Sequence, residues 1–120
     1  MNKKTYSGWL SVRDYGESSD VLFISSLSDP FAEELEWMAG KQVCVRYWIT
    51  DKEATLEAAQ EQFIKRLFGA ADVEFFARYS DITGYLWTDE NLKVGGHDLL
   101  EELKSSEGLW LILEVEQLDV

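Results

Sequence analysis

The sequence predicts an α+β domain with a largely antiparallel sheet of about six strands and three helices, in the order ββ-α-β-α-ββ-α-β. Two observations support this fold class: apolar and polar side chains alternate along several short runs, and helix-capping signals occur between those runs. Short polar loops between neighbouring strands favour antiparallel pairing. Because the 120 residues contain one proline and neither a repeat nor a linker-like stretch, we expect a single globular domain over residues 1–120.

The chain is expected to begin with a hairpin and a short helix. The run TYSGWLSVR at 5–13 alternates in period two, and VLFISSL at 21–27 follows it after a polar, turn-forming segment. Asp29 then stands at an N-cap position before a proline, and Gly40 is placed as a stop. These signals predict a helix of about two to three turns between them.

A third strand and a longer helix are predicted next. The run KQVCVRYWIT at 41–50 alternates, with valine, tyrosine and isoleucine side chains on one face. Thr50 and Glu53 have the spacing of a capping box, and Gly69 is placed to end the helix that would start there. The apolar stripe of that helix would consist of Leu56, Ala59, Phe63, Ile64 and Leu67.

The rest of the chain is predicted to hold two strands, a short helix and a final strand. The runs at 72–79 and 81–89 are rich in aromatic and β-branched residues, which is typical of strands. In VGGHDLLEEL, Asp98 and Glu101 have capping-box spacing around an apolar pair, so we expect a helix to start at Asp98. Alternation returns in LWLILEVEQL at 109–118 and predicts the last strand.

The residues most often used in catalysis or metal binding are scarce. His97, the only histidine, directly precedes the expected helix cap, and Cys44 lies within an alternating strand, where a thiol behaves as a small hydrophobe. Zinc sites require three or four ligands of these types, and no nucleophile elbow, phosphate loop or dinucleotide-binding glycine pattern occurs. We therefore predict no catalytic residue, no metal and no cofactor. The alternative is a small-molecule binder or minor enzyme with a pocket between sheet and helices, using tyrosine and tryptophan side chains, Arg46 or Arg78, and His97.

The net charge of −12 is the strongest global signal. It argues against direct binding to a phosphate backbone. Residues 81–120 contain ten acidic side chains against two lysines, a net charge of −8. We expect this acidic C-terminal third to bind a protein partner with a basic surface, with exposed aromatic side chains supplying affinity, unless it serves solubility alone. The predicted partner-binding residues are Asp89, Glu90, Glu101, Glu102, Glu107, Glu114, Glu116, Trp87 and Trp110.

The tryptophans define a second expected surface. Trp9, Trp48 and Trp110 fall on the strand faces opposite the most aliphatic ones. If helices cover one face of the sheet, these side chains would gather on the other face, as a second layer of core or as a partner surface. A homodimer, or another homo-oligomeric assembly, that shares this face is the further alternative.

The composition also indicates a compartment and a general type of protein. A single cysteine, the absence of an apolar leader and the absence of a membrane-length apolar run predict a cytoplasmic protein without a membrane span. In its small size, its acidity and its lack of a catalytic constellation, the chain is similar in general type to immunity proteins and phage-encoded inhibitors. That similarity implies a non-enzymatic binding module that blocks its partner.

Overall fold

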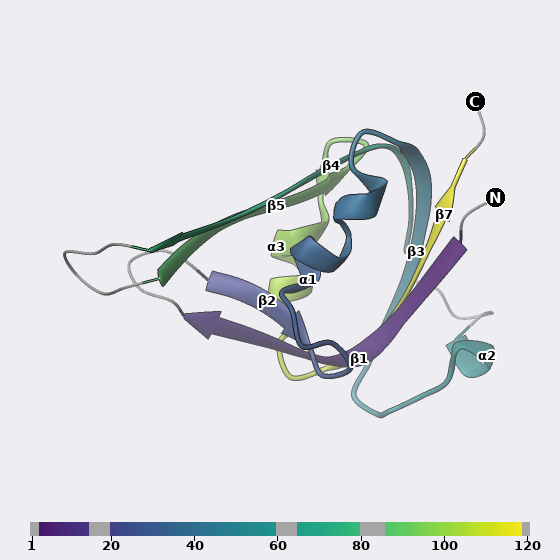
Figure 1. Ribbon diagram of the computed structural model, residues 1–120. Coiled ribbons are helices and arrows are strands. Elements are labelled where there is room, and N and C mark those ends of the chain that lie inside the picture. Colours follow the sequence, from purple (N-terminus) through teal and green to yellow (C-terminus); the bar gives the residue numbers. More distant parts are fainter. Residues whose placement is uncertain (1–2, 15–19, 60–64, 80–85, 119–120) are drawn as a thin grey trace.

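A computed structural model describes residues 3–14, 20–59, 65–79 and 86–118 (Figure 1). It contains one antiparallel sheet with the strand order β2-β1-β7-β3-β4-β5-β6, together with short helices. The α+β class is confirmed, with seven strands in place of the expected six. The strands are β1 (Lys3–Asp14), β2 (Asp20–Ile24), β3 (Gln42–Thr50), β4 (Lys65–Tyr79), β5 (Leu86–Val94), β6 (His97–Asp98) and β7 (Trp110–Gln117). The helices are α1 (Phe31–Glu34), the 3₁₀ turn η1 (Glu36–Met38), α2 (Leu56–Ala59) and α3 (Leu99–Lys104).

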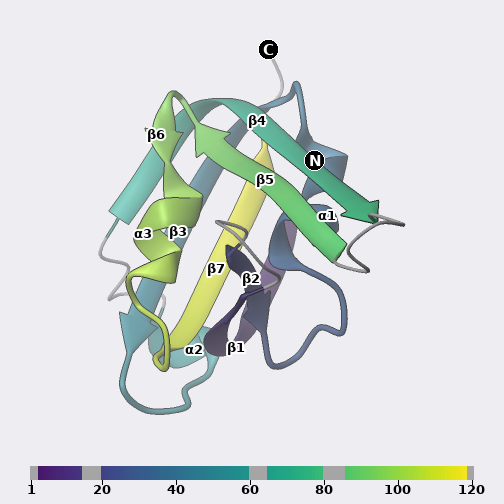
Figure 2. The same ribbon diagram turned by 90° about the vertical axis from the view of Figure 1, so that its left-hand side faces the viewer.

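Two long strands curl the sheet. The first half of β1 pairs with β7 and its second half with β2, and β4 likewise pairs first with β3 and then with β5. The curled sheet surrounds α1 and α3, which lie toward its opposite open ends (Figures 1 and 2). The α2 segment lies on the other side of the sheet (Figure 1). None of the helices in the described ranges is long and apolar enough to cross a bilayer.

The main core lies between the inner face of the sheet and the two enclosed helices. Alternation along β3 places Val43, Val45 and Tyr47 inward, as the sequence predicts, because successive strand residues point to opposite faces. Burial of these side chains, with those of β7, removes apolar surface from water. Each Å² of apolar surface buried contributes roughly 25 cal/mol, and this is the main stabilising term of the fold. The helices contribute Phe31, Ala32, Leu99, Leu100 and Leu103.

The start of α3 confirms the capping prediction. Asp98 is the N-cap residue, and its Oδ1 accepts a hydrogen bond from the backbone N–H of Glu101 at 3.1 Å. This bond satisfies one of the N–H groups that the first turn of a helix leaves without an intrahelical partner. His97 therefore lies directly before the helix, in β6.

The predicted helix from Thr50 to Gly69 is wrong. Thr50 ends β3, only Leu56–Ala59 is helical, and β4 begins at Lys65; positions 60–64 lie outside the described residues. Leu67 pairs with Val45 and packs against the main core from a strand. The residues after 64 also alternate in period two, and pairing with β3 outweighs their helical periodicity.

Three other predicted elements differ from the structure in their bounds. The first helix is divided into α1 and η1, and Pro30, not Asp29, occupies its N-cap position without a side-chain cap. The strand expected at 21–27 ends at Ile24. For the strand expected at 81–89, β5 begins at Leu86, and 80–85 lie outside the described residues.

Candidate functional site

The predicted partner-binding residues whose side chains the structure describes come from several elements and differ in their surroundings. Glu90 comes from β5, Glu101 and Glu102 from α3, and Glu107 from the turn after α3. Glu114, Glu116 and Trp110 belong to β7. Trp87 and Asp89 occupy β5 positions whose side chains lie outside the described part of the structure.

Glu90 belongs to the interior. Its side chain is 2% exposed and pairs with Lys104, with Nζ 2.9 Å from Oε1. The same oxygen accepts a hydrogen bond from the backbone N–H of Leu22 at 3.1 Å. Burial raises the pKa of Glu90 above its ordinary value, against the opposing effect of the hydrogen bond from Lys104. This carboxylate therefore serves contacts within the protein.

The acids of β7 are neutralised by neighbouring strands. Glu114 lies directly opposite Arg46 of β3, is 3% exposed, and has Oε1 3.4 Å from both Arg46 Nη1 and Lys3 Nζ. Glu116 Oε2 lies 3.6 Å from Arg46 Nη2. Because cross-strand neighbours of opposite charge attract each other, these groups stabilise the outer face of the sheet and leave little free negative charge there.

The acids around α3 differ in their availability. Glu102 Oε2 lies 2.5 Å from His97 Nε2, so the histidine has a carboxylate partner that the sequence reasoning missed. Glu107 is exposed, but its Oε2 accepts a hydrogen bond from the backbone N–H of Val12 at 2.7 Å. Glu101 is also exposed. Glu101 and Glu107 are thus the most accessible of the predicted acids.

The histidine–carboxylate pair lies near a buried tyrosine. Burial, and after it the Glu102 carboxylate, raise the pKa of Tyr47, whose ring belongs to the main core. The pair itself is partly exposed, with side-chain exposures of 40% for His97 and 26% for Glu102. Within the described ranges, no three histidine, cysteine, aspartate or glutamate residues are grouped as metal ligands, and Cys44 is buried.

Three tryptophans gather on the outer face of the sheet, as predicted: Trp9, Trp48 and Trp110. Trp9 of β1 lies opposite Trp110, with ring centroids 5.1 Å apart at an interplanar angle of 76°. The expectation that Trp110 is exposed is wrong: it is only 9% exposed, and its Nε1 donates to the Ala54 carbonyl at 3.1 Å. Trp48, with Ala54 and Leu56 at the start of α2, packs against Trp110 and Ile112 to form a small second core. Trp9, at 37%, retains an exposed edge.

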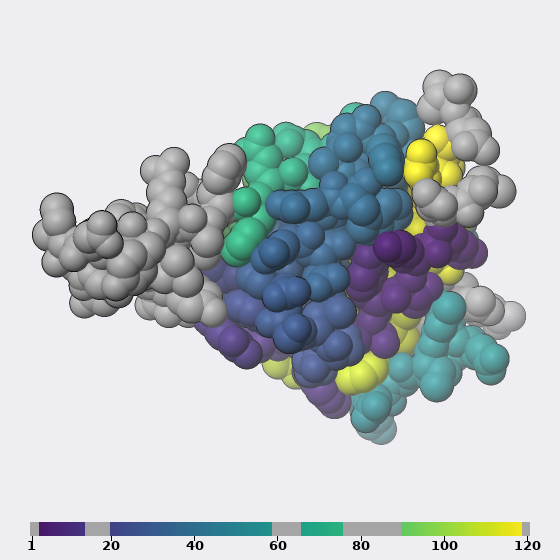
Figure 3. All heavy atoms as spheres, in the orientation of Figure 1, coloured from purple at the N-terminus to yellow at the C-terminus, as the bar shows by residue number. Residues whose placement is uncertain are grey.

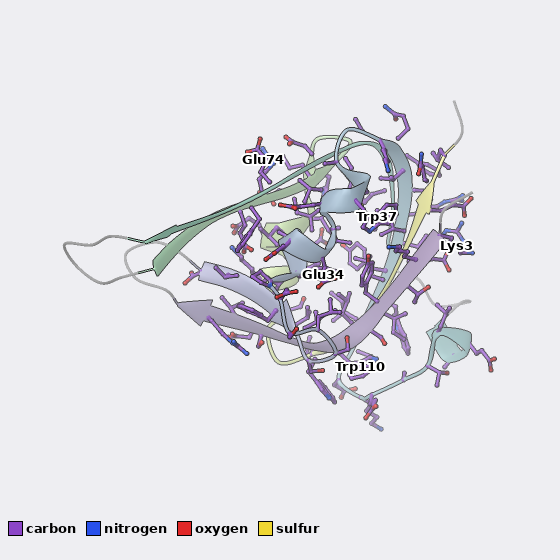
Figure 4. All side chains as sticks on the ribbon, in the orientation of Figure 1. Lys3, Glu34, Trp37, Glu74 and Trp110 are labelled. Atoms are coloured by element: carbon purple, nitrogen blue, oxygen red, sulfur yellow. The ribbon has the colours of Figure 1, made fainter. Side chains whose placement is uncertain are left out.

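Around α1, which lies on the side of the molecule shown in Figure 3, is a group of four acidic side chains: Asp29, Glu33, Glu34 and Glu36. Three of its four carboxylates are exposed, and Glu34 is half-buried (Figure 4). Desolvation, followed by repulsion from the other three carboxylates, raises the pKa of Glu33. No ion pair joins these four groups to a basic side chain in the described part of the chain. We call Asp29, Glu33, Glu34 and Glu36 the α1 acidic cluster.

An aromatic side chain adjoins this cluster. Trp37 donates from Nε1 to the Tyr6 hydroxyl at 2.8 Å, and the ammonium groups of Lys4 and Lys41 lie 5.2 and 5.7 Å from its ring centroid. These contacts hold the ring in place by hydrogen bonding and cation–π attraction. Asp29 of this cluster enters the sequence-based prediction only as a candidate N-cap, and a local charge count over 29–36 would have found all four acids.

The arrangement offers concentrated negative charge beside an ordered aromatic ring, which are features of surfaces that bind proteins. Comparison with known protein families, with curated proteins and with solved structures finds no match to this chain.

Proposed function

We propose that this chain is a non-enzymatic protein-binding module that recognises the basic surface of a partner protein, acting as an inhibitor or immunity-type protein. The α1 acidic cluster is the observation that carries the proposal. Desolvation raises the pKa of Glu33, and repulsion from the other three carboxylates adds to this rise. Like charges that are close together and have no ion-pair partner cost stability, and a partner of opposite charge would relieve that cost.

The acidic C-terminal third enters the proposal through Glu101 and Glu107, which are exposed. Charge at such positions accelerates encounter with a basic protein and selects against acidic ones. Affinity would come from a smaller number of desolvated contacts, for which the ordered Trp37 ring next to the cluster is suited. Blocking would then be steric, because a bound module of this size covers its partner's surface.

Affinity capture from a lysate of the source organism tests this proposal with three baits. The first is the unchanged protein, and the second carries Glu33→Lys and Glu36→Lys. The third carries Glu53→Lys and Glu57→Lys, which reverse the same number of exposed charges on the α2 segment. Thermal unfolding of each bait establishes that it is folded.

We expect one basic protein to be retained by the unchanged and α2-segment baits and lost from the cluster bait. About 0.5 M salt should release it, because screening at that concentration shortens the Debye length to about half its physiological value. Equal retention of that protein by the cluster bait would refute the role of the α1 acidic cluster. If the unchanged bait retains no protein, the proposed function is wrong.

A further inference from the structure

The two ends of the curled sheet meet without backbone pairing. Among the described residues β2 pairs only with β1, at one end of the strand order, while β5 pairs with β4 and β6 and lies next to the last strand at the other end. The curvature of the sheet nevertheless brings these two strands into contact. Closure of the sheet along this seam therefore depends on side chains.

A carboxylate and an ammonium group bridge the seam. Glu90 of β5 accepts the Leu22 N–H, and Lys104 of α3 donates to the Asp20 carbonyl at 2.6 Å while pairing with Glu90. These two side chains thus satisfy an N–H and a C=O of β2, as an adjacent strand would do. Leu22 is fully buried, so its N–H requires such a partner.

Burying this ion pair costs desolvation free energy that an apolar contact in the same space would not cost. Glu90 Oε2 is buried and has no hydrogen-bond partner in the described part of the structure. A buried ion pair is often no more stabilising than apolar side chains of similar volume, whereas removing one partner leaves a buried charge uncompensated. Unlike an apolar contact, the pair connects β5, β2 and α3 through directional hydrogen bonds.

We propose that Glu90 and Lys104 form a latch that holds β5 and α3 against the edge of β2 and so controls local opening of the curled sheet at this seam. While the latch is closed, the edge of β2 is withheld from pairing with other chains, a common hazard of unpaired strand edges. Breaking the latch opens the seam without unfolding the central strands, because β3, β7 and the first half of β1 pair independently of it.

Native-state amide hydrogen exchange, followed residue by residue by NMR, tests the latch. The measured quantity is the exchange rate of the Leu22 amide divided by that of the Val45 amide, which lies in the central β3–β7 pairing. Lys104→Met removes the ammonium group. Lys93→Met is the matched control, since it removes the same charge from an exposed position on β5.

We expect Lys104→Met to raise this ratio at least tenfold and Lys93→Met to leave it unchanged. An unchanged ratio in folded Lys104→Met, whether both amides accelerate equally or neither does, would overturn the latch. If Lys104→Met does not fold, the double variant Glu90→Gln/Lys104→Met removes both charges while keeping an acceptor for Leu22. The ratio should rise in that variant too, and a ratio equal to that of the unchanged protein would refute the proposal.

Discussion

Gly95 sits where the turn after β5 crosses the bend of β4, and replacing it with alanine should destabilise the protein strongly. Its φ is +59°, and a Cβ on it would lie 2.2 Å from the Phe68 carbonyl oxygen and 3.6 Å from Gly69 Cα. The neighbouring Gly96 has a φ of +83° but would place its Cβ with nothing within 4 Å. The two glycines thus separate steric overlap from backbone strain.

The expected costs follow from this difference. A left-handed conformation costs an L-residue about 1–2 kcal/mol, so Gly96→Ala should lower the free energy of unfolding by about that amount. Gly95→Ala carries the same strain and also forces backbone atoms apart, which adds about 1–3 kcal/mol when a packed region must shift. A flexible side chain cannot relieve this overlap, because the contacted atoms belong to the backbone.

Urea unfolding followed by tryptophan fluorescence measures both variants, with the dependence of the free energy on denaturant compared between them. Gly95→Ala should be the less stable by at least about 1 kcal/mol. Equal stability of Gly95→Ala and Gly96→Ala would show that the Phe68 carbonyl does not stand in the way of a Cβ on Gly95, and the bend of β4 would have to be reconsidered.

Three further expectations concern the cap, a buried phenol and the accessible acids. Asp98→Ala should cost about 1 kcal/mol in urea unfolding, and unaltered stability would contradict the capping bond. The raised pKa of Tyr47 keeps its proton in the folded state, so stability should be complete below about pH 10 and fall as the pH rises further. Tyr47→Phe should reduce that alkaline loss, measured by urea unfolding across this pH range; the same loss in both proteins would rule out Tyr47 as its source. Glu101→Lys with Glu107→Lys should slow association with the captured partner at low salt in a surface-binding assay, whereas unchanged association rates would exclude the α3 end from the interface.

Strand positions were predictable because period two is a local property. The alternation in 41–50 and 109–118 identifies β3 and β7, including the inward faces that carry Val45 and Leu113. The segment after Thr50 was not predictable in this way, since its apolar spacing fits a helix while its second half pairs as β4. Sheet pairing with β3 decided that conflict, and a tertiary contact is invisible in a local pattern.

The accessible part of the acidic charge was harder to predict than its amount. A count of side chains finds the excess in the last third, but the partners of those acids come from elsewhere: Lys3 and Arg46 for Glu114, and the β2 backbone for Glu90. These contacts join residues that are far apart in the sequence. Spacing within a segment therefore predicts the Asp98 cap, which is local, and misses the neutralisation of Glu114, which is not.

This division of charge bears directly on where a partner would bind. Acids of the last third that pair internally, such as Glu90 and Glu114, contribute little to the field outside the molecule because a nearby cation cancels them. The four carboxylates of the α1 acidic cluster form no ion pair in the described part of the chain, so their field extends into solvent over about a Debye length. The basic partner that we propose would therefore be attracted toward α1 more strongly than the distribution of acids along the sequence suggests. Trp37 lies next to this cluster, in η1.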